Sequence, residues 1–548
     1  MEQSFLSHLR KSIENHWNLS AFSDDGGENY SYADFAKHIE TLKLLLEAAG
    51  LKQGDKVAII GKNSSMWAMN FFSIMASGYV AVPILHDFKP MSIHHIVHHS
   101  EAKVLIVSDA IWNTLEADEL ADLLLTLRLE NLEVRQAKEV RLQEKGIAYR
   151  LFAERHPKAL RLEDLAFHQD QPEELALISY TSGTSGFSKG VMIPYRALWG
   201  NMQFGKDHLK VLRPGTDVIS ILPMAHMYGL AFEVYTEVCL GVHIHFITRT
   251  PSPQVIAETF KRHRPVLIIA VPLILEKIVR KSIFPFLQSK KYQILNRLPI
   301  VKGQLHHQIC RKLTDALGGN FYEVIIGGAA FNHEVESFLH RIGFAYTVGY
   351  GMTECAPLIT YADKKTYVPG SVGRVIDRME IRIDSPDPEN VVGEIQTRGV
   401  NVMLGYYHNE EATSHAFTAD GWLRTGDLGT IDKDGNLFIR GRSKNMLLGP
   451  NGQNIYPEEL EDQLNALPYV GESLVVHRGD KLVALIHPDL DLMDKDNVQS
   501  TQFSEIMKQN LEHFNHGQPS YAKVKAFQIF QDEFEKTPKR SIKRYLYQ

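Results

Sequence analysis

Glycines, hydroxyl side chains and a lysine are concentrated between residues 180 and 190, in the run YTSGTSGFSKG. The run follows an apolar segment, 175–178, that has the composition of a buried strand. Its glycines let the backbone turn sharply and approach an anion closely. Hydroxyls and backbone N–H groups can donate hydrogen bonds to phosphate oxygens, and Lys189 adds a positive charge. The run therefore predicts a phosphate-binding loop; a Gly/Ser turn without a ligand is the alternative.

The lysine of this loop does not fit the Walker A pattern G-x-x-x-x-G-K-[ST]. Ser188 precedes it and Gly190 follows it. An ordinary P-loop ATPase is therefore disfavoured, and the class of phosphate chemistry has to be inferred from residues elsewhere in the chain.

The composition of the 548-residue chain excludes several classes of protein. A formal net charge of −6 leaves no basic excess for phosphates, so we expect no nucleic-acid partner. Three widely spaced cysteines and 25 scattered histidines predict neither a disulfide framework nor a structural zinc site. There is no run of about 18 apolar residues and no signal peptide, which favours a cytoplasmic protein.

Short apolar runs alternate with helical segments through much of the chain, which is typical of parallel sheets covered by helices. A first group of predicted strands, with a helix over 66–75, comprises 56–60, 79–82 and 104–107. A second group with the same spacing comprises 218–221, 242–245 and 266–269. We therefore expect two doubly wound α/β subdomains. The charged stretch 127–161 predicts a solvated helix-and-turn excursion.

The pattern changes near residue 390, where short strands separated by Gly and Asp turns indicate a β-rich subdomain. From about residue 445 the chain has the length and pattern of a small α+β domain. The predicted fold class is α/β, with doubly wound subdomains and the β-rich subdomain in a large N-terminal domain, 1–441. A hinge at 442–444 and a mobile C-terminal domain at 445–548 complete the prediction.

Several motifs occur in the order found in one known family. The glycine loop resembles the pattern [ST]-[ST]-G-[ST]-[ST]-G-x-P-K-G of the acyl-adenylating (AMP-forming) superfamily, with Ser188 at the usual proline. The further matches are GGAA at 327–330, YGMTE at 350–354, GWLRTGD at 421–427 and RGRSK at 440–444. The resemblance runs from about Tyr30 to the C-terminus, and it implies the acyl-adenylating enzyme fold with ATP and Mg²⁺ as cofactors.

The resemblance assigns a role to each matched residue. Tyr350 would stack on adenine, Thr353 would hold the α-phosphate, and Asp427 would accept hydrogen bonds from the ribose hydroxyls. Glu354, assisted by Thr181, would bind Mg²⁺, which prefers hard oxygen ligands. The residues expected at ATP or AMP are Thr181, Ser182, Gly183, Thr184, Ser185, Gly186, Lys189, Gly328, Ala329, Ala330, Tyr350, Gly351, Met352, Thr353, Asp427 and Arg442. The residues expected to act in catalysis are Lys189, Thr353, Glu354 and Lys543.

The segment LPMAHMYG at 222–229 resembles the part of the family that lines the acyl pocket, here through His226 and Tyr228. Family members that activate amino acids place an Asp in this segment, and this chain has no carboxylate there. A buried substrate ammonium without a partner is costly, so we do not expect an amino acid as the substrate. A satisfied core histidine is the alternative interpretation of His226.

The segment GQNIYPEELE, which begins at Gly452, looks most like bacterial long-chain fatty acid–CoA ligases. In that group this glycine region reaches the active site during thioester formation. Coenzyme A is the expected acceptor and acyl carrier protein the alternative, and because no carrier domain follows residue 548 we expect the thiol on another molecule. Lys444 matches the hinge about which the C-terminal domain rotates.

The lysine that bridges the substrate carboxylate and the α-phosphate in this family has no direct match. Gapless comparison with the family segment P-K-T-x-x-G-K-[IL] puts Arg540 at the glycine and Ser541 at the lysine. Lys539 and Lys543 flank Ser541 on the same side of an extended strand. Lys543 is favoured because its long stem can span the offset, and two solvated tail lysines are the alternative.

The combined prediction is an AMP-forming long-chain fatty acid–CoA ligase. A catalytically inactive nucleotide-binding regulatory protein is the alternative from a different class. Intact Lys189, Thr353, Glu354 and Asp427 argue against that alternative. A fatty substrate is compatible with loose peripheral membrane contact, although no basic amphipathic segment indicates such contact.

Overall fold

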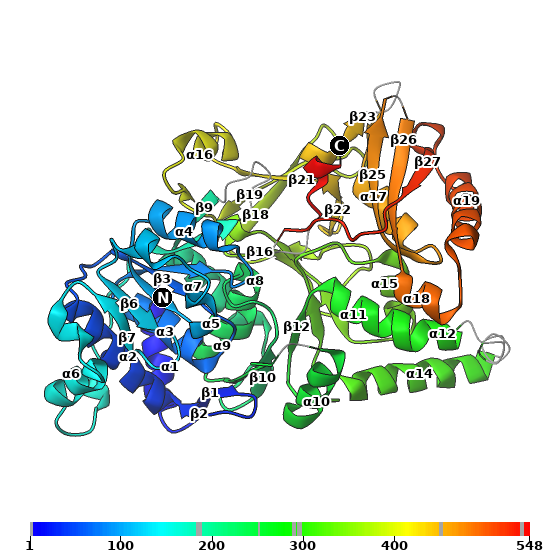
Figure 1. The fold of residues 1–548 in the computed structure, drawn as a ribbon. Coiled ribbons are helices and arrows are strands. Elements are labelled where there is room, and N and C mark those ends of the chain that lie inside the picture. Colours follow the sequence, from blue (N-terminus) through cyan, green and yellow to red (C-terminus); the bar gives the residue numbers. More distant parts are fainter. Residues whose placement is uncertain are drawn as a thin grey trace.

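The computed structural model describes residues 4–181, 189–249, 252–287, 292, 299–448, 453–479, 481–537 and 542–547. Figure 1 shows a large N-terminal part, coloured blue to yellow-green, and a smaller C-terminal part in orange and red. The predicted fold class is confirmed, since α/β layers and a β-rich region precede a small α+β region. The boundaries at 441 and 445 stay a prediction.

The largest sheet has eight strands in the order β20-β9-β8-β4-β3-β5-β6-β7. Its central strands run parallel and are almost continuously apolar, because hydrophobic clusters pack on both faces. The strands are β3 (Lys56–Ile60), β4 (Val80–Ile84), β5 (Ala102–Val107), β6 (Leu125–Arg128), β7 (Val134–Ala137), β8 (Leu175–Thr181), β9 (Lys189–Pro194) and β20 (Gly405–Tyr406). The helices of this region are α1 (Phe5–Asn15), α2 (Tyr32–Ala48), α3 (Ser65–Ala76), α4 (Pro90–His99), α6 (Ile147–Arg155) and α7 (Tyr195–His208).

Strands β6 and β7 occupy part of the segment 127–161, for which a solvated excursion was expected. Leu125 and Leu127 of β6 are fully buried, and β6 pairs in parallel with β5. The charged neighbours stay at the edge, where Arg128 and Arg135 both bind the carboxylate of Asp109. Burial of alternate leucines therefore outweighed the local charge, and that expectation was wrong for the start of the segment.

The second α/β layer consists of two groups of strands that meet edge to edge. The first group, in spatial order, is β10 (Asp217–Ser220), β11 (His243–Phe246), β1 (Ser20–Asp24) and β2 (Asn29–Ser31). The second group is β12 (Ile268–Ala270), β13 (Val324–Ile326) and β14 (Tyr346–Val348). The N–H of Val266 donates to the carbonyl of Asp217 over 3.0 Å where the groups meet. Strands expected at 218–221, 242–245 and 266–269 are thus present as β10, β11 and β12.

Helices α10 (Pro253–His263), α14 (Pro299–Ala316) and α15 (His333–Arg341) accompany this layer, and α10 packs against both β10 and α14. Figure 1 shows β1, β2, β10 and α10 at the lower edge of the molecule, away from the C-terminal part.

The β-rich region is antiparallel throughout its described strands. One sheet comprises β15 (Tyr350–Gly351), β16 (Leu358–Tyr361) and β17 (Arg374–Val375). The other comprises β18 (Met379–Asp384), β19 (Gly393–Gly399), β21 (Leu423–Ile431) and β22 (Leu437–Arg442). Bulges interrupt the register of β21 against both neighbours, and such irregularities redirect side chains near functional sites.

The C-terminal part has a hydrophobic core of its own, which includes Leu460, Phe503 and Met507. Its strands are β23 (Leu447–Leu448), β24 (Asn454–Ile455), β25 (Val470–Arg478), β26 (Lys481–Pro488) and β27 (Val524–Ile529). Its helices are α17 (Pro457–Asn465), α18 (Leu490–Lys495) and α19 (Ser500–His516). Within the described part of the chain, every helix is too short or too polar to cross a bilayer.

Candidate active site

Thr181 and Lys189 face each other at the base of a hairpin. β8 ends at Thr181, β9 begins at Lys189, and the two residues are register partners in the antiparallel pair. The predicted phosphate loop lies between them, and Ser182, Gly183, Thr184, Ser185 and Gly186 fall outside the described residues. The hairpin therefore holds both ends of the loop at the ends of two neighbouring strands of the largest sheet.

Tyr406 connects Lys189 to Glu354. The Lys189 Nζ lies over the Tyr406 ring, 4.7 Å from its centroid, and the Tyr406 hydroxyl donates to Glu354 Oε1 over 2.9 Å. Pairing of β20 with β9 places Tyr406 here, with Val191 as its register partner. Burial and the neighbouring Glu354 raise the pKa of Tyr406, so the hydroxyl stays protonated and acts as a donor.

Tyr350, Asp427 and Arg442 form a second group. The Tyr350 hydroxyl donates to Asp427 Oδ2 over 2.7 Å, and Arg442 Nε lies 2.9 Å from Asp427 Oδ1. Burial raises the pKa of Asp427, an effect opposed by the Arg442 charge and by the hydrogen bond from Tyr350. The three residues predicted to contact the adenosine thus lie together.

Glycine residues form one wall of a cavity beside Tyr350. A Cβ on Gly351 would lie 2.1 Å from the Pro357 carbonyl oxygen, and Gly328 has a φ of +83° that favours glycine. A Cβ on Gly327 would lie 3.0 Å from the Tyr228 ring. Ala329 and Ala330 follow Gly328 and are exposed, with Gly328, after β13. The backbone at these three glycines carries no side chains, which permits the close approach of a flat base.

The same cavity is apolar and is also lined by the predicted acyl segment. Its lining includes His226, Met227, Tyr228, Phe232, Tyr350 and Tyr361, together with Met352 and Thr353. The Tyr228 hydroxyl donates to the Ile325 carbonyl over 3.0 Å, and the Tyr228 N–H donates to His226 Nδ1 over 3.3 Å. His226 therefore carries the proton of its neutral form on Nε2.

Asn63 and Glu233 anchor the acyl segment. The Glu233 carboxylate accepts hydrogen bonds from Ser220 Oγ and from the N–H groups of Ile221 and Leu222. Asn63 Nδ2 donates to the Leu222 carbonyl over 2.6 Å, and Asn63 Oδ1 accepts from the N–H of Met224 over 3.0 Å. These contacts fix the chain just before His226 enters the cavity.

The remaining predicted residues lie toward the C-terminal part. Lys444 is exposed in a short 3₁₀ turn after β22, and Gly452 lies outside the described residues. Lys543 Nζ pairs with Glu535 Oε2 over 3.2 Å. Lys539 and Ser541 also fall outside the described residues. Their roles stay predictions.

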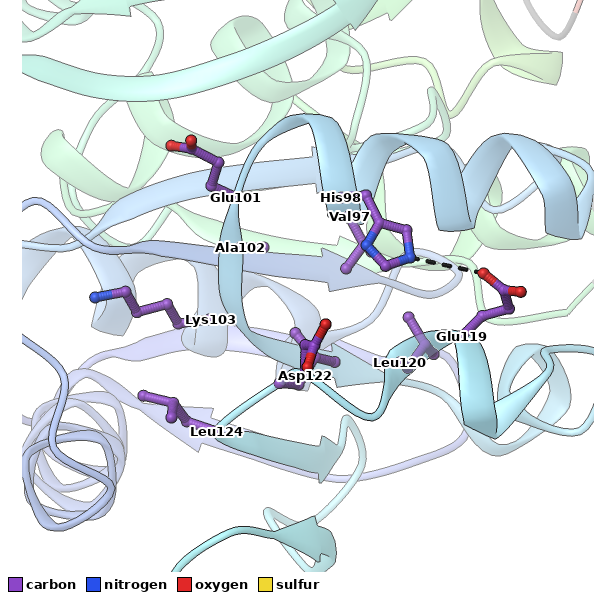
Figure 2. Close-up of a pocket in the computed structure, with 10 residues that line it drawn as sticks. Val97, His98, Glu101, Ala102, Lys103, Glu119, Leu120, Asp122 and Leu124 are labelled. Carbon is purple, nitrogen blue, oxygen red and sulfur yellow. Dashed lines mark ion pairs between the residues drawn. The ribbon is translucent and has the colours of Figure 1, made fainter.

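A second hollow, of about 320 Å³, lies over α4, β5 and the turn at Ala117–Leu120 (Figure 2). Its lining combines apolar side chains with exposed polar ones, including His98, whose Nε2 lies 3.9 Å from Glu119 Oε2. Lys103 on its rim pairs with Asp55 over 2.7 Å. None of the predicted site residues lines this hollow.

The donor set around Glu354 fits Mg²⁺. The Glu354 carboxylate accepts a hydrogen bond from a neutral hydroxyl, Thr353 precedes Glu354 in the chain, and Thr181 is the register partner of Lys189; carboxylate and hydroxyl oxygens are the hard donors that this ion prefers. Cys355, next to Glu354, is fully buried and its pKa is raised by burial, so the thiol is not an activated nucleophile.

Sequence reasoning missed Tyr406, Asn63 and Glu233. Each acts through a contact between segments far apart in the chain. The signal for Tyr406 is the GYY run at 405–407 after a strand, which is too short to read as a strand itself. Asn63 and Glu233 carry no local pattern that distinguishes them from helix-flanking polar residues.

Comparisons with known proteins identify related sequences. A family model described as AMP-binding enzyme matches residues 9–407, and one described as AMP-binding enzyme C-terminal domain matches 445–547. The long-chain-fatty-acid–CoA ligase FadD15 of Mycobacterium bovis is 29% identical over 481 residues, covering 81% of this chain and 74% of that protein. The long-chain-fatty-acid–CoA ligase of Escherichia coli O157:H7 is 27% identical over 497 residues, covering 86% of this chain and 83% of that protein.

Solved structures share the fold. ATP-bound MatB from Rhodopseudomonas palustris superposes with a TM-score of 0.79 at 22% identity, covering 100% of this chain and 98% of that one. O-succinylbenzoate coenzyme A synthetase (MenE) from Bacillus subtilis, with ATP and magnesium ion, gives a TM-score of 0.75 at 20% identity and 98% coverage of each chain. Because the first family model spans well over half of the sequence, the chain belongs to the AMP-binding enzyme family.

Proposed function

We propose that this protein is an AMP-forming ligase that activates a long-chain fatty acid with ATP and transfers the acyl group to coenzyme A. The observation that carries the proposal is one apolar cavity that is lined by the predicted acyl segment and also by Tyr350 and Thr353, the residues next to an adenosine-binding edge and a phosphate-binding edge. Lys189, Tyr406 and Glu354 form the phosphate-binding edge, and Tyr350 and Asp427 belong to the adenosine-binding edge.

The lining of the cavity supports a fatty acid as the substrate. Its described lining residues include no Asp or Glu, so a substrate ammonium would have no partner there. Glu233 is buried behind the segment, and its Oε2 accepts hydrogen bonds from backbone and hydroxyl donors. The long-chain fatty acid ligases among the relatives support the same substrate class.

The chain's own groups position the reactants and stabilise charge. The carboxylate of the acid attacks the α-phosphorus of ATP, which gives acyl-adenylate and releases pyrophosphate. Lys189 and Thr353 hold phosphate oxygens, while Asp427 and Tyr350 hold the adenosine. When bound at Glu354, Mg²⁺ would neutralise charge on the phosphates. The thiol of coenzyme A then attacks the acyl carbon and AMP leaves, without a covalent enzyme intermediate.

Fatty-acid-dependent exchange between ATP and pyrophosphate tests the first half-reaction. Glu354→Gln should lose nearly all exchange while remaining folded, because it removes an anionic ligand without changing shape. Glu101→Gln is the matched control, since Glu101 also accepts a tyrosine hydroxyl, from Tyr407 over 2.6 Å, but lies exposed. Wild-type protein that supports no exchange with any chain length would favour an inactive regulatory protein.

The second half-reaction distinguishes the acceptors. Pre-formed acyl-adenylate should disappear faster when coenzyme A is added than when acyl carrier protein is added. A faster reaction with the carrier protein would replace coenzyme A in the proposal and leave the adenylation step unchanged.

A further inference from the structure

A second cluster of chemistry-bearing side chains lies on β10 and β11. His243 and His245 are two residues apart on β11, so both side chains leave the same face of the sheet. Asp217 on β10 is the register partner of His243. Its Oδ1 lies 3.1 Å from His243 Nδ1 and 2.7 Å from His245 Nε2. Because Asp217 is distant from the histidines in the chain, their spacing alone predicted no metal site.

A chain of hydrogen bonds fixes the proton on His243. The Asn29 Nδ2 donates to Ser20 Oγ over 3.1 Å, which turns Asn29 Oδ1 toward Ser23. The Ser23 hydroxyl donates to that oxygen over 2.8 Å. Ser23 Oγ then accepts from His243 Nε2–H over 2.7 Å. In its neutral form, His243 therefore points the lone pair of Nδ1 at the carboxylate oxygen of Asp217.

Two lone pairs facing each other at 3.1 Å repel unless a proton or a metal ion lies between them. We propose that Asp217 Oδ1, His243 Nδ1 and His245 Nε2 bind a divalent transition-metal ion, and that Zn²⁺ is the best match. Two imidazoles and one carboxylate, with water as a fourth ligand, are a donor set that Zn²⁺ accepts. The three ligand atoms lie within 4.8 Å of one another.

The observed separations are close to those a tetrahedral ion requires. A tetrahedron with bonds of about 2.0 Å has edges of about 3.3 Å. The edge between His243 Nδ1 and Asp217 Oδ1 is already 3.1 Å long. The edge between His245 Nε2 and Asp217 Oδ1 is 2.7 Å long and must widen by about 0.6 Å when an ion binds. The Asp217 side chain is 41% exposed and the His245 side chain 7% exposed, so solvent reaches the cluster from the carboxylate side.

Neighbouring groups restrain one ligand and limit the positive charge that would repel a metal ion. The His263 ring stacks on His245 with centroids 3.7 Å apart, which restricts rotation of the ligand. Arg249 and Arg262 are the nearby cations, and both pair with Asp25 at 2.6 Å, which offsets their charge.

The test uses full-length protein stripped of metal with a chelator and titrated with Zn²⁺ by calorimetry. Co²⁺ serves as a spectroscopic probe, because a four-coordinate nitrogen and oxygen site gives a visible absorption band. Asp217→Asn and a double variant, His243→Ala with His245→Ala, remove ligands. His208→Ala is the matched control, since His208 pairs with Asp377 over 2.8 Å on the surface elsewhere.

Wild-type protein should bind one more Zn²⁺ per chain than the double variant, and His208→Ala should behave as wild type. Loss of the hydrogen-bond acceptor in Ser23→Ala should weaken Zn²⁺ binding about 10- to 100-fold, and loss of the ligand in Asp217→Asn should weaken it more. Circular dichroism establishes that each variant is folded. Equal Zn²⁺ stoichiometry and affinity in wild type and Asp217→Asn would overturn the proposal. The contact between His243 and Asp217 in the wild-type protein would then be a hydrogen bond through a proton.

Discussion

Tyr406→Phe is the sharpest test of how the phosphate edge works. The substitution keeps the ring under Lys189 and removes only the hydroxyl that donates to Glu354 over 2.9 Å. A hydrogen bond to a charged group contributes about 1.5–3 kcal/mol. Loss of a partner that orients a metal ligand typically lowers metal affinity by about 10- to 100-fold, equivalent to about 1.4–2.7 kcal/mol. The free energy expected from the lost hydrogen bond therefore matches the free energy expected from the weaker metal binding.

The assay is ATP–pyrophosphate exchange at a fixed fatty acid concentration and increasing free Mg²⁺. Tyr406→Phe should need about tenfold more Mg²⁺ for half-maximal rate and should approach the wild-type rate at saturation. Tyr407→Phe is the control, because that hydroxyl donates to the exposed Glu101. An unchanged Mg²⁺ requirement in Tyr406→Phe, or an equal loss of rate at every Mg²⁺ concentration, would refute the role given to the hydroxyl.

Three further predictions concern the hinge, the terminal lysine and the core. Lys444→Pro should spare acyl-adenylate formation and slow thioester formation, because proline fixes φ at the hinge; equal losses in both half-reactions would contradict this. Lys543→Ala should lose most adenylation whereas Lys539→Ala should not, and full activity in both variants would show that neither lysine bridges the substrates. Burial raises the pKa of Glu237 from its ordinary value of 4.5 to about 8. The unfolded chain therefore releases this proton first, and the group's contribution to stability is full below about pH 4.5 and lost as pH rises to about 8. Glu237→Met should flatten this loss and raise the Tm at pH 8, and a wild-type pH dependence of unfolding in the variant would contradict it.

Much of the nucleotide-binding edge follows from local sequence. An apolar run before a glycine-rich and hydroxyl-rich loop located Thr181, and matches to family motifs located Gly328 and Tyr350; the structure has each of them at or just after a strand end. The pattern works because the residues that end a buried strand must be both turn formers and ligand contacts, so composition changes abruptly there.

The partners of these residues could not be predicted in the same way. Tyr406 reaches Lys189 only because the two-residue strand β20 pairs with β9, and so short a strand has no periodicity to detect. The cluster at His243 likewise depends on the register of β10 against β11. Side chains brought together by pairing across long sequence separations are invisible to any single window of sequence.

The pairing of β21 with β22 explains why a moving C-terminal domain need not disturb nucleotide binding. Asp427 and Arg442 are cross-strand partners on β21 and β22, and their ion pair lies within one sheet. Arg442 is the last residue of β22, and the proposed hinge, Lys444, follows two residues later. A rotation about Lys444 would therefore bring either the terminal lysine or the Gly452 region to the nucleotide site. The nucleotide site itself would stay assembled. If the proposed function holds, the N-terminal part would hold the adenylate through both half-reactions, and the C-terminal part would supply the group that differs between them.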